Sequence, residues 1–174
     1  MPTTPQTDSR KTKASSGVTR TGRASARPDD AVSALMADHR KVEELFKQYQ
    51  KAKSDPGRKQ KIFQQIDMEL KIHMQIEEEV FYPESREFVA DEETVNEAVV
   101  EHASAKSLMT QLEKMTPDDP YYDAKVKVLQ EMIHHHVEEE ETEFFPECRR
   151  SEMDLKAVGE RLQARKAQLM QGAN

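Results

Sequence analysis

The sequence predicts an all-α protein, an up-down-up-down antiparallel four-helix bundle followed by an extra C-terminal helix. Three observations predict this fold class. Apolar residues recur at helical spacing from residue 29 onward. Turn signals rich in Pro, Gly and Asp divide this stretch into helix-length segments with short links, which favours antiparallel neighbours. The chain has only 5 glycines in 174 residues, which is few for a β-rich fold.

Residues 1–28 are expected to form a disordered basic tail. They contain six Lys or Arg residues against one acidic residue, Asp8, and are rich in Ser, Thr, Pro and Ala. Such a segment cannot bury enough apolar surface to offset the entropy it would lose on ordering. Its simplest role is a solubilising extension. A contact with nucleic acid or another polyanion is the alternative.

Residues 29–150 are expected to form the bundle. Asp29 or Asp30 caps a first helix that ends near Gln50, before the turn signal SDPG. A second helix begins near Asp55 and carries a proline in its first turn, where a missing backbone N–H costs nothing. Pro83 is predicted to end it.

The third helix is expected from about Glu92 to Met115. Its predicted inward face carries Val95, Val99, Met109 and Leu112. The TPDDP stretch then introduces a fourth helix that ends before Pro146. Residues 151–174 should form the last helix, with a capping-box-like start at Ser151, packed across the bundle or against a partner.

Composition narrows the class of protein. No run of about 18 apolar residues and no apolar leader is present, so neither a membrane span nor a secretory signal is expected. The lone Cys148 excludes an internal disulfide framework and fits a reducing compartment. We therefore expect a cytoplasmic monomer or small homo-oligomer.

The bundle region repeats itself at an offset of 63 positions. FYPESR at 81–86 aligns with FFPECR at 144–149, and His73 aligns with His136. The same offset places Asp38-His39 over Glu101-His102 without a gap. Each half therefore contains a histidine followed 34 residues later by His-x-x-x-Glu, which indicates a duplicated helical hairpin.

Helical periodicity places the repeated polar residues on apolar stripes. The set comprises four histidines and two glutamates, one histidine on each helix: His39, His73, Glu77, His102, His136 and Glu140. A lone histidine on such a face is usually a hydrogen-bonded core residue. Six polar residues repeated in register favour a built site. Two carboxylates inside a bundle require either cations or strongly raised pKa values.

A metal pair satisfies that requirement. The i, i+4 spacing puts the His and Glu of each motif on one face, so the histidine can bind one ion while the carboxylate reaches a second. Imidazole and carboxylate ligands suit iron, manganese or zinc. Six ligands for two ions leave open positions for a small molecule.

These residues resemble a known family. DHRKVEELF with HMQIEEEVFYP in the first half, and HVEEEETEFFP in the second, are similar to the hemerythrin-like HHE cation-binding domain. The resemblance covers about residues 30–150. It implies a hemerythrin-like bundle with two iron ions, bridged by oxide or hydroxide, whose ligands are the six residues named above. It also implies binding of, or reaction with, oxygen, hydrogen peroxide or nitric oxide, with catalase-like activity as the enzymatic form.

Two departures separate this sequence from the oxygen carriers that it resembles. They have a second histidine four residues after the third-helix ligand, where this chain has Lys106, and an Asp five residues after the last histidine, where this chain has Glu140 at four. The resemblance therefore favours sensing or peroxide handling over reversible oxygen carriage.

Other functions stay open at this point. The first is a non-enzymatic iron, oxygen or redox sensor, or an iron store, whose metal occupancy controls stability or partner binding. A ferritin-like carboxylate bundle expects Glu-x-x-His on two helices, and only Glu131 with His134 fits. A purely structural bundle leaves the six polar residues unexplained.

Residues near the cluster receive simpler interpretations. Glu69 is assigned to the surface or rim. Glu78 and Glu141 repeat in both halves and are interpreted as a solvated edge. His134, His135 and the glutamates Glu138, Glu139 and Glu143 are assigned to the surface, while Tyr49, Tyr121 and Tyr122 stay candidates for an extra ligand.

Overall fold

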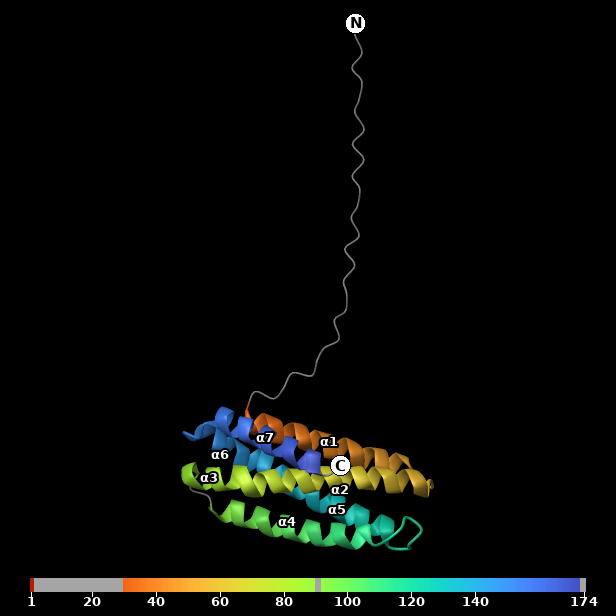
Figure 1. Ribbon diagram of the computed structural model, residues 1–174. Coiled ribbons are helices and arrows are strands. Elements are labelled where there is room, and N and C mark those ends of the chain that lie inside the picture. Colours follow the sequence, from red (N-terminus) through yellow and green to blue (C-terminus); the bar gives the residue numbers. More distant parts are fainter. Residues whose placement is uncertain (2–29, 90–91, 173–174) are drawn as a thin grey trace.

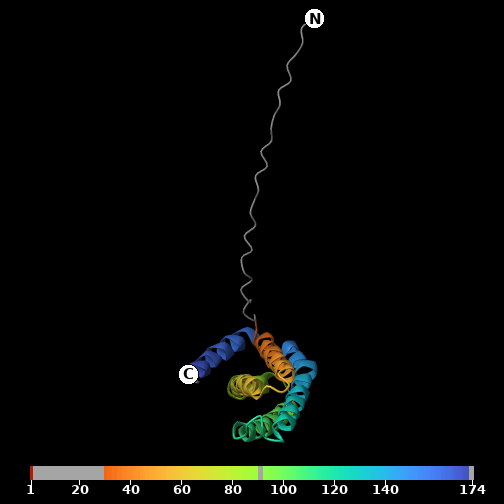
Figure 2. The ribbon, with the colours of Figure 1, turned by 90° about the vertical axis from the view of Figure 1, so that its right-hand side faces the viewer.

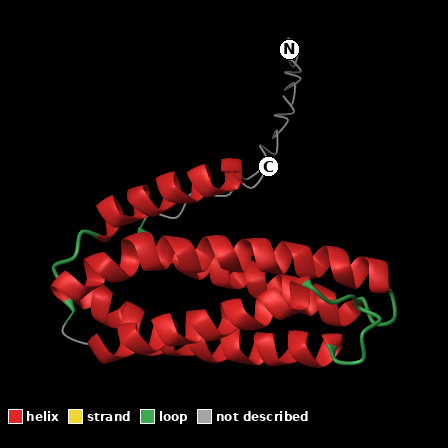
Figure 3. Cartoon of the chain, turned by 60° about the horizontal axis from the view of Figure 1, so that its bottom comes forward, coloured by secondary structure: helices red, strands yellow, loops and turns green. Residues whose placement is uncertain are grey.

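The computed structural model describes Met1, residues 30–89 and residues 92–172. Every regular element within these residues is helical. Four long helices form the bundle: α1 (Ala31–Lys51), α2 (Pro56–Ile76), α4 (Glu92–Glu113) and α5 (Tyr122–Glu139). They run side by side, and short connections join them at the two ends of the bundle (Figures 1 and 3). The predicted fold class is confirmed. The disorder expected for the basic tail, and its alternative role in polyanion contact, concern residues 2–28, which lie outside the described residues.

Side-chain caps start the first two helices where the sequence predicted. Asp30 accepts a hydrogen bond from the backbone N–H of Ser33 at 2.7 Å, and Asp55 accepts one from Arg58 at 2.9 Å. Each cap satisfies one of the backbone donors that a helix N-terminus leaves free. Pro56 occupies the first position of α2, as expected.

The second and fourth helices continue past their prolines, so Pro83 and Pro146 were wrongly predicted as helix ends. A π-helical turn, η1 (Glu77–Phe81), leads into α3 (Tyr82–Phe88). Its counterpart η2 (Glu140–Phe144) leads into α6 (Phe145–Arg150). The wider turn shifts the hydrogen-bond register just before the proline, which then lies in the first turn of the next helix, where its missing N–H has no consequence.

Two apolar clusters fill the interior on either side of a polar layer. One lies toward the C-terminal ends of α1 and α4 and includes Phe46, Leu70, Met109 and Leu129. The other gathers the aromatic residues of the π turns and short helices, including Phe81, Tyr82, Phe144 and Phe145. The polar layer between them contains the six repeated His and Glu residues, all buried.

One predicted core residue is misplaced. Val99 is 40% exposed, although it was assigned to the inward face of the third helix. The buried stripe of α4 instead runs through Val95, Ala98, His102 and Ala105. Val99 lies beside this stripe because the inward face follows alternating steps of three and four residues.

Helix α7 (Leu155–Gly172) lies on the outside of the bundle, against α1, α2 and η1 (Figures 1 and 2). The predicted start at Ser151 is wrong, because Asp154 is the residue whose carboxylate accepts the backbone N–H of Ala157, at 3.0 Å. Arg161 pairs with Glu84, and Arg165 pairs with Glu79. None of the helices in the described residues combines the length and apolarity needed to cross a membrane.

Candidate metal centre

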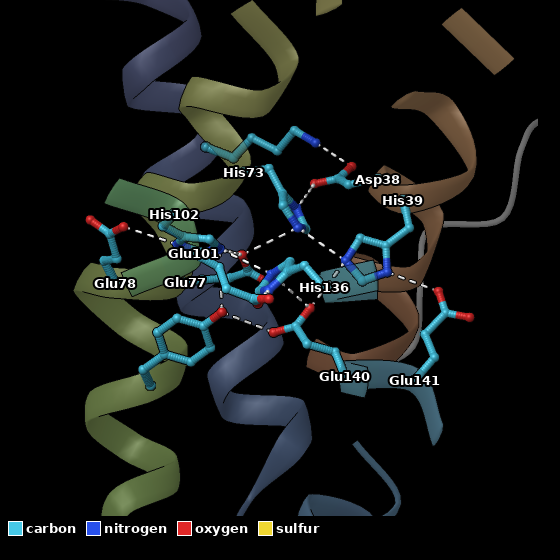
Figure 4. A network of polar contacts seen from close by, with 12 residues as sticks. Asp38, His39, His73, Glu77, Glu78, Glu101, His102, His136, Glu140 and Glu141 are labelled. Atoms are coloured by element: carbon cyan, nitrogen blue, oxygen red, sulfur yellow. Dashed lines mark hydrogen bonds and ion pairs between the residues drawn. The ribbon is translucent and has the colours of Figure 1, made fainter. Parts of the chain in front are cut away.

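All six predicted ligands meet in the polar layer at the middle of the bundle (Figure 4). Each long helix contributes one histidine, and each π turn contributes a glutamate as its first residue: His39, His73, His102, His136, Glu77 and Glu140. The π turns were not predicted. Such turns interrupt α-helices frequently at functional sites, and here they start at the glutamate of each His-x-x-x-Glu motif.

The four histidines form two close pairs, one from each half of the repeat. The Nε2 atoms of His39 and His73 lie 3.0 Å apart, and those of His102 and His136 also lie 3.0 Å apart. Two imidazole nitrogens that bind one ion at about 2.1 Å, in adjacent coordination positions, have a separation of about 3 Å. Each pair therefore has the spacing of two ligands to one ion.

Each glutamate lies between the two histidine pairs. Oε2 of Glu77 is 3.2 Å from Nε2 of His73 and 3.5 Å from Nε2 of His102. Oε2 of Glu140 is 3.3 Å from Nε2 of His39 and 3.6 Å from Nε2 of His136. Both carboxylates therefore reach both pairs, which is the arrangement of bridging ligands between two ions.

Four further carboxylates face the outer nitrogens of the histidines. We call them the outer carboxylates: Asp38, Glu78, Glu101 and Glu141. The Nδ1 atoms of His39, His102 and His136 lie 2.8, 2.9 and 2.8 Å from Glu141, Glu78 and Glu101, respectively. Asp38 is 3.7 Å from Nδ1 of His73, beyond hydrogen-bond length. Carboxylates in this position fix the tautomer and orientation of metal-binding histidines.

The interpretation of Glu78 and Glu141 as a solvated edge was therefore wrong. The signal was present in the repeat, since Asp38 aligns with Glu101 and Glu78 aligns with Glu141 at the same offset of 63. The cross-helix pairing was not predictable from spacing. Glu78 and Glu141 each contact the histidine of the other hairpin, which depends on how the two hairpins pack.

Basic side chains hold three of the outer carboxylates. Lys106 donates to both oxygens of Glu78, at 2.6 Å each. Arg40 pairs with Glu141, and Lys166 of α7 pairs with Asp38. The position where the oxygen carriers have a histidine ligand therefore holds a lysine that fixes the carboxylate behind His102.

Tyr82 is a site residue that the sequence analysis missed. Its buried hydroxyl donates to Oε1 of Glu140 at 2.9 Å and lies 3.5 Å from Nε2 of His102. The tyrosines considered earlier lie elsewhere. Tyr49 donates to Asp123, Tyr122 packs in the apolar cluster near Phe63, and Tyr121 is exposed. The repeat could have identified Tyr82, because it aligns with Phe145, and its hydroxyl is therefore a difference between the two halves.

The two buried glutamates have pKa values shifted in opposite directions. Burial and the charge of Glu140 raise the pKa of Glu77 well above 4.5. Burial also acts to raise the pKa of Glu140, but the charge of His136 and the neighbouring His39 outweigh it and lower that pKa to about 2. Glu77 is therefore much harder to ionise than Glu140.

The histidines divide in the same way. Burial opposes charge on His39 and His136, but Glu140 and the outer carboxylates outweigh it and raise both pKa values. Burial lowers the pKa of His73, and burial with the charge of His136 lowers that of His102 to about 2. In each pair, one histidine therefore has a raised pKa and the other a lowered pKa.

Several ligand atoms lack any hydrogen-bond partner. They are both side-chain oxygens of Glu77 and Oε2 of Glu140. A buried carboxylate oxygen without a partner is costly, and a bound cation would remove that cost. The unpartnered oxygens point to the same place as the histidine Nε2 atoms, and imidazole with carboxylate suits iron, manganese or zinc. The residues present fit a pair of divalent ions.

Residues 30–148 match the family described as hemerythrin HHE cation binding domain. The chain belongs to this family. Among solved structures, a hemerythrin HHE cation binding domain-containing protein from Mycobacterium kansasii superposes with a TM-score of 0.72. It shares 23% sequence identity, over 83% of this chain and 89% of that one, and it supports the fold. A DNA nickase from Nostoc sp. is 34% identical over 115 residues, 66% of this chain. The match spans 32% of the nickase, about a third of its length.

The remaining polar residues lie outside the hemerythrin HHE cluster. His134 and His135 are exposed, as predicted. Glu69 was assigned to the surface or rim, but it is buried at 6% exposure and pairs with Lys41. The long lysine side chain reaches across from α1, so a carboxylate on α2 can be buried without a metal.

Proposed function

We propose that this chain binds two iron ions through His39, His73, Glu77, His102, His136 and Glu140, and that the pair binds or reacts with oxygen, hydrogen peroxide or nitric oxide. The observation that carries the proposal is the position of Glu77 and Glu140, each between two histidine pairs, with an Oε2 atom that has no hydrogen-bond partner. A pair of non-haem irons supplies redox chemistry and open coordination positions for small ligands.

The protein's own residues prepare this site in three ways. Three of the outer carboxylates hydrogen-bond His39, His102 and His136 and so orient their Nε2 atoms inward. The apolar clusters on both sides exclude bulk water, which strengthens electrostatic interactions inside. Tyr82 holds a hydroxyl proton beside Glu140, where it can hydrogen-bond a ligand or the carboxylate.

Peroxide handling is the enzymatic form of the proposal. A catalase-like reaction converts two molecules of hydrogen peroxide into one of oxygen and two of water, so it needs no further reductant. This reaction requires two metal ions that can change oxidation state, in a site that admits a small neutral molecule. We expect turnover to be lost in His136→Ala and retained in His135→Ala, which changes an exposed neighbour.

Metal analysis with absorption spectroscopy tests the proposal. We expect two irons per chain after anaerobic loading with iron(II), and an absorption change on adding oxygen, peroxide or nitric oxide. His73→Ala and His102→Ala remove one histidine from each pair and should each lower the iron content. Well under two irons per chain in the wild-type protein, with no spectral change, would sink the idea.

A sensing or storage role is the second candidate, and the unpartnered Glu77 oxygens favour it. Because Glu77 is fully buried and neither of its oxygens has a hydrogen-bond partner, the metal-free chain should be markedly less stable than the loaded chain. Metal that binds only the folded state stabilises it by mass action. Thermal unfolding with and without iron measures this. A large stabilisation without peroxide turnover selects sensing or storage.

A further inference from the structure

We propose that small uncharged molecules reach the histidine cluster through the seam between α1 and α5, past a gate formed by Val42, Ile133 and Val137. This inference rests on the proposed function, since it concerns access to the same site. The ligand side chains are almost fully buried, with His102 1% and Glu77 0% exposed. A reactant therefore needs a path through the protein.

A small cavity touches all four histidines. It has a volume of about 10 Å³, near the lower limit for a single water-sized molecule, and neither glutamate borders it. The rest of its wall is aliphatic or thioether: Val42, Leu70, Met74, Ile133 and Val137. The approach to the cluster from this side is therefore dry and apolar.

A surface groove meets the same side chains from outside. It has a volume of about 360 Å³ and runs between α1 and the α5–η2 segment. Its wall shares four residues with the internal cavity: His39, Val42, Ile133 and Val137. The barrier between solvent and the histidines is therefore a single layer of aliphatic side chains, of which Val137 is the least buried.

The opposite seam, between α2 and α4, is closed by different residues at the equivalent positions. Met74 stands where Val137 stands in the other half, and it is 1% exposed. Lys106 and Lys71 span that seam to Glu78 and Glu113. On the α1–α5 side, the residue equivalent to Lys106 is Glu43, which pairs within its own helix, and Arg40 makes the ion pair to Glu141. The two seams of the repeat thus differ where they cover the histidines, with the partly exposed Val137 on the α1–α5 side and the buried Met74 on the other.

The gate selects by charge. An anion would lose its hydration among Val42, Ile133 and Val137 without gaining a hydrogen-bond partner, which is costly. Molecular oxygen, nitric oxide and hydrogen peroxide carry no charge and are small enough to pass with modest side-chain motion. The substrate class assigned to this path is therefore small neutral molecules.

Two substitutions test the gate. Val137→Met installs the residue of the closed seam, and Val137→Ala widens the passage. Val128→Met is the matched control, because it makes the same change on the same helix at a side chain that is 48% exposed. The iron(II)-loaded protein is mixed with dissolved oxygen or nitric oxide in a stopped-flow instrument. The reaction should be about tenfold slower in Val137→Met than in the wild type, as expected for overpacking a narrow passage. Val137→Ala should be faster, and Val128→Met unchanged.

A second measurement needs no redox chemistry. Dissolved oxygen is paramagnetic and enhances the relaxation of nearby methyl groups in NMR spectra, and it can be applied to zinc-loaded and to metal-free protein alike. We expect a larger enhancement at the methyls of Ile133 and Val137 than at those of Leu70, the equivalent of Ile133 in the opposite seam. Val137→Met should reduce the enhancement at Ile133.

The outcomes separate this inference from the proposed function. Equal oxygen enhancement at both seams, or an unchanged rate in Val137→Met, overturns the gate. The expected NMR pattern in a protein that fails to react when iron-loaded supports the gate and overturns the proposed reaction.

Discussion

Tyr82 and Phe145 occupy equivalent positions in the two halves of the repeat, but only Tyr82 places a hydroxyl group against a buried carboxylate, Glu140. Phe145 instead stacks on His39, with ring centroids 5.8 Å apart. The carboxylate equivalent to Glu140 is Glu77, and neither of its oxygens has a partner. The duplicated site is therefore asymmetric, with one glutamate hydrogen-bonded to a tyrosine and the other without a hydrogen-bond partner.

Tyr82→Phe should destabilise the metal-free protein by about 1–3 kcal/mol, because it leaves a buried oxygen of ionised Glu140 without its donor. Phe145→Tyr is the informative companion. By the symmetry of the repeat, the new hydroxyl would face Glu77. This variant should therefore lower the stability of the metal-free protein by less than Tyr82→Phe does, or raise it. Chemical denaturation of the metal-free chain measures both. Equal effects of the two variants would contradict the assigned asymmetry.

Glu141→Ala should weaken metal binding by about 10- to 100-fold, the usual effect of removing the partner of a metal-binding histidine. The carboxylate of Glu141 lies 2.8 Å from Nδ1 of His39 and fixes the ring orientation. Glu138→Ala is the control, an exposed acidic residue three positions earlier. Competition with a chelator of known affinity gives the dissociation constants. If both variants bind metal as tightly as the wild type, the outer carboxylates have no orienting role.

The six-residue cluster and the bundle were predictable because they depend on short-range patterns. The steps of three, four and seven residues place His73 and Glu77 on one helical face, and the 63-residue offset selects His136 from three adjacent histidines. These relations hold within one helix or between aligned hairpins, so they need no knowledge of packing.

The parts that were missed depend on packing between helices. Glu78 contacts His102 from the other hairpin, and Tyr82 reaches Glu140 across 58 residues of sequence. The π turns were missed for a related reason. Pro83 normally predicts a helix end, but a turn with one extra residue precedes it, and the helix continues.

Metal binding should release protons and weaken as the pH falls. Glu77, His39 and His136 all have raised pKa values in the metal-free state, so each tends to hold a proton that a metal ion must displace. Affinity should therefore decrease as the pH falls through these raised pKa values. Calorimetry in buffers with different ionisation heats counts the protons, and Glu77→Gln should release fewer. A pH-independent affinity would contradict the protonation pattern.

Gly159→Ala should loosen α7, although alanine normally favours a helix over glycine by about 1 kcal/mol. A Cβ at this position would lie 2.8 Å from the backbone nitrogen of Ala31, and neither backbone can easily move. Gly172 provides the control, because a Cβ there meets nothing within 4 Å, so Gly172→Ala should be neutral or slightly stabilising. Loosening α7 would also release Lys166 from Asp38, beside His73. We therefore expect Gly159→Ala to lower both the melting temperature and the metal affinity. A variant that lowers the melting temperature alone would show that α7 supports the fold without supporting the metal centre.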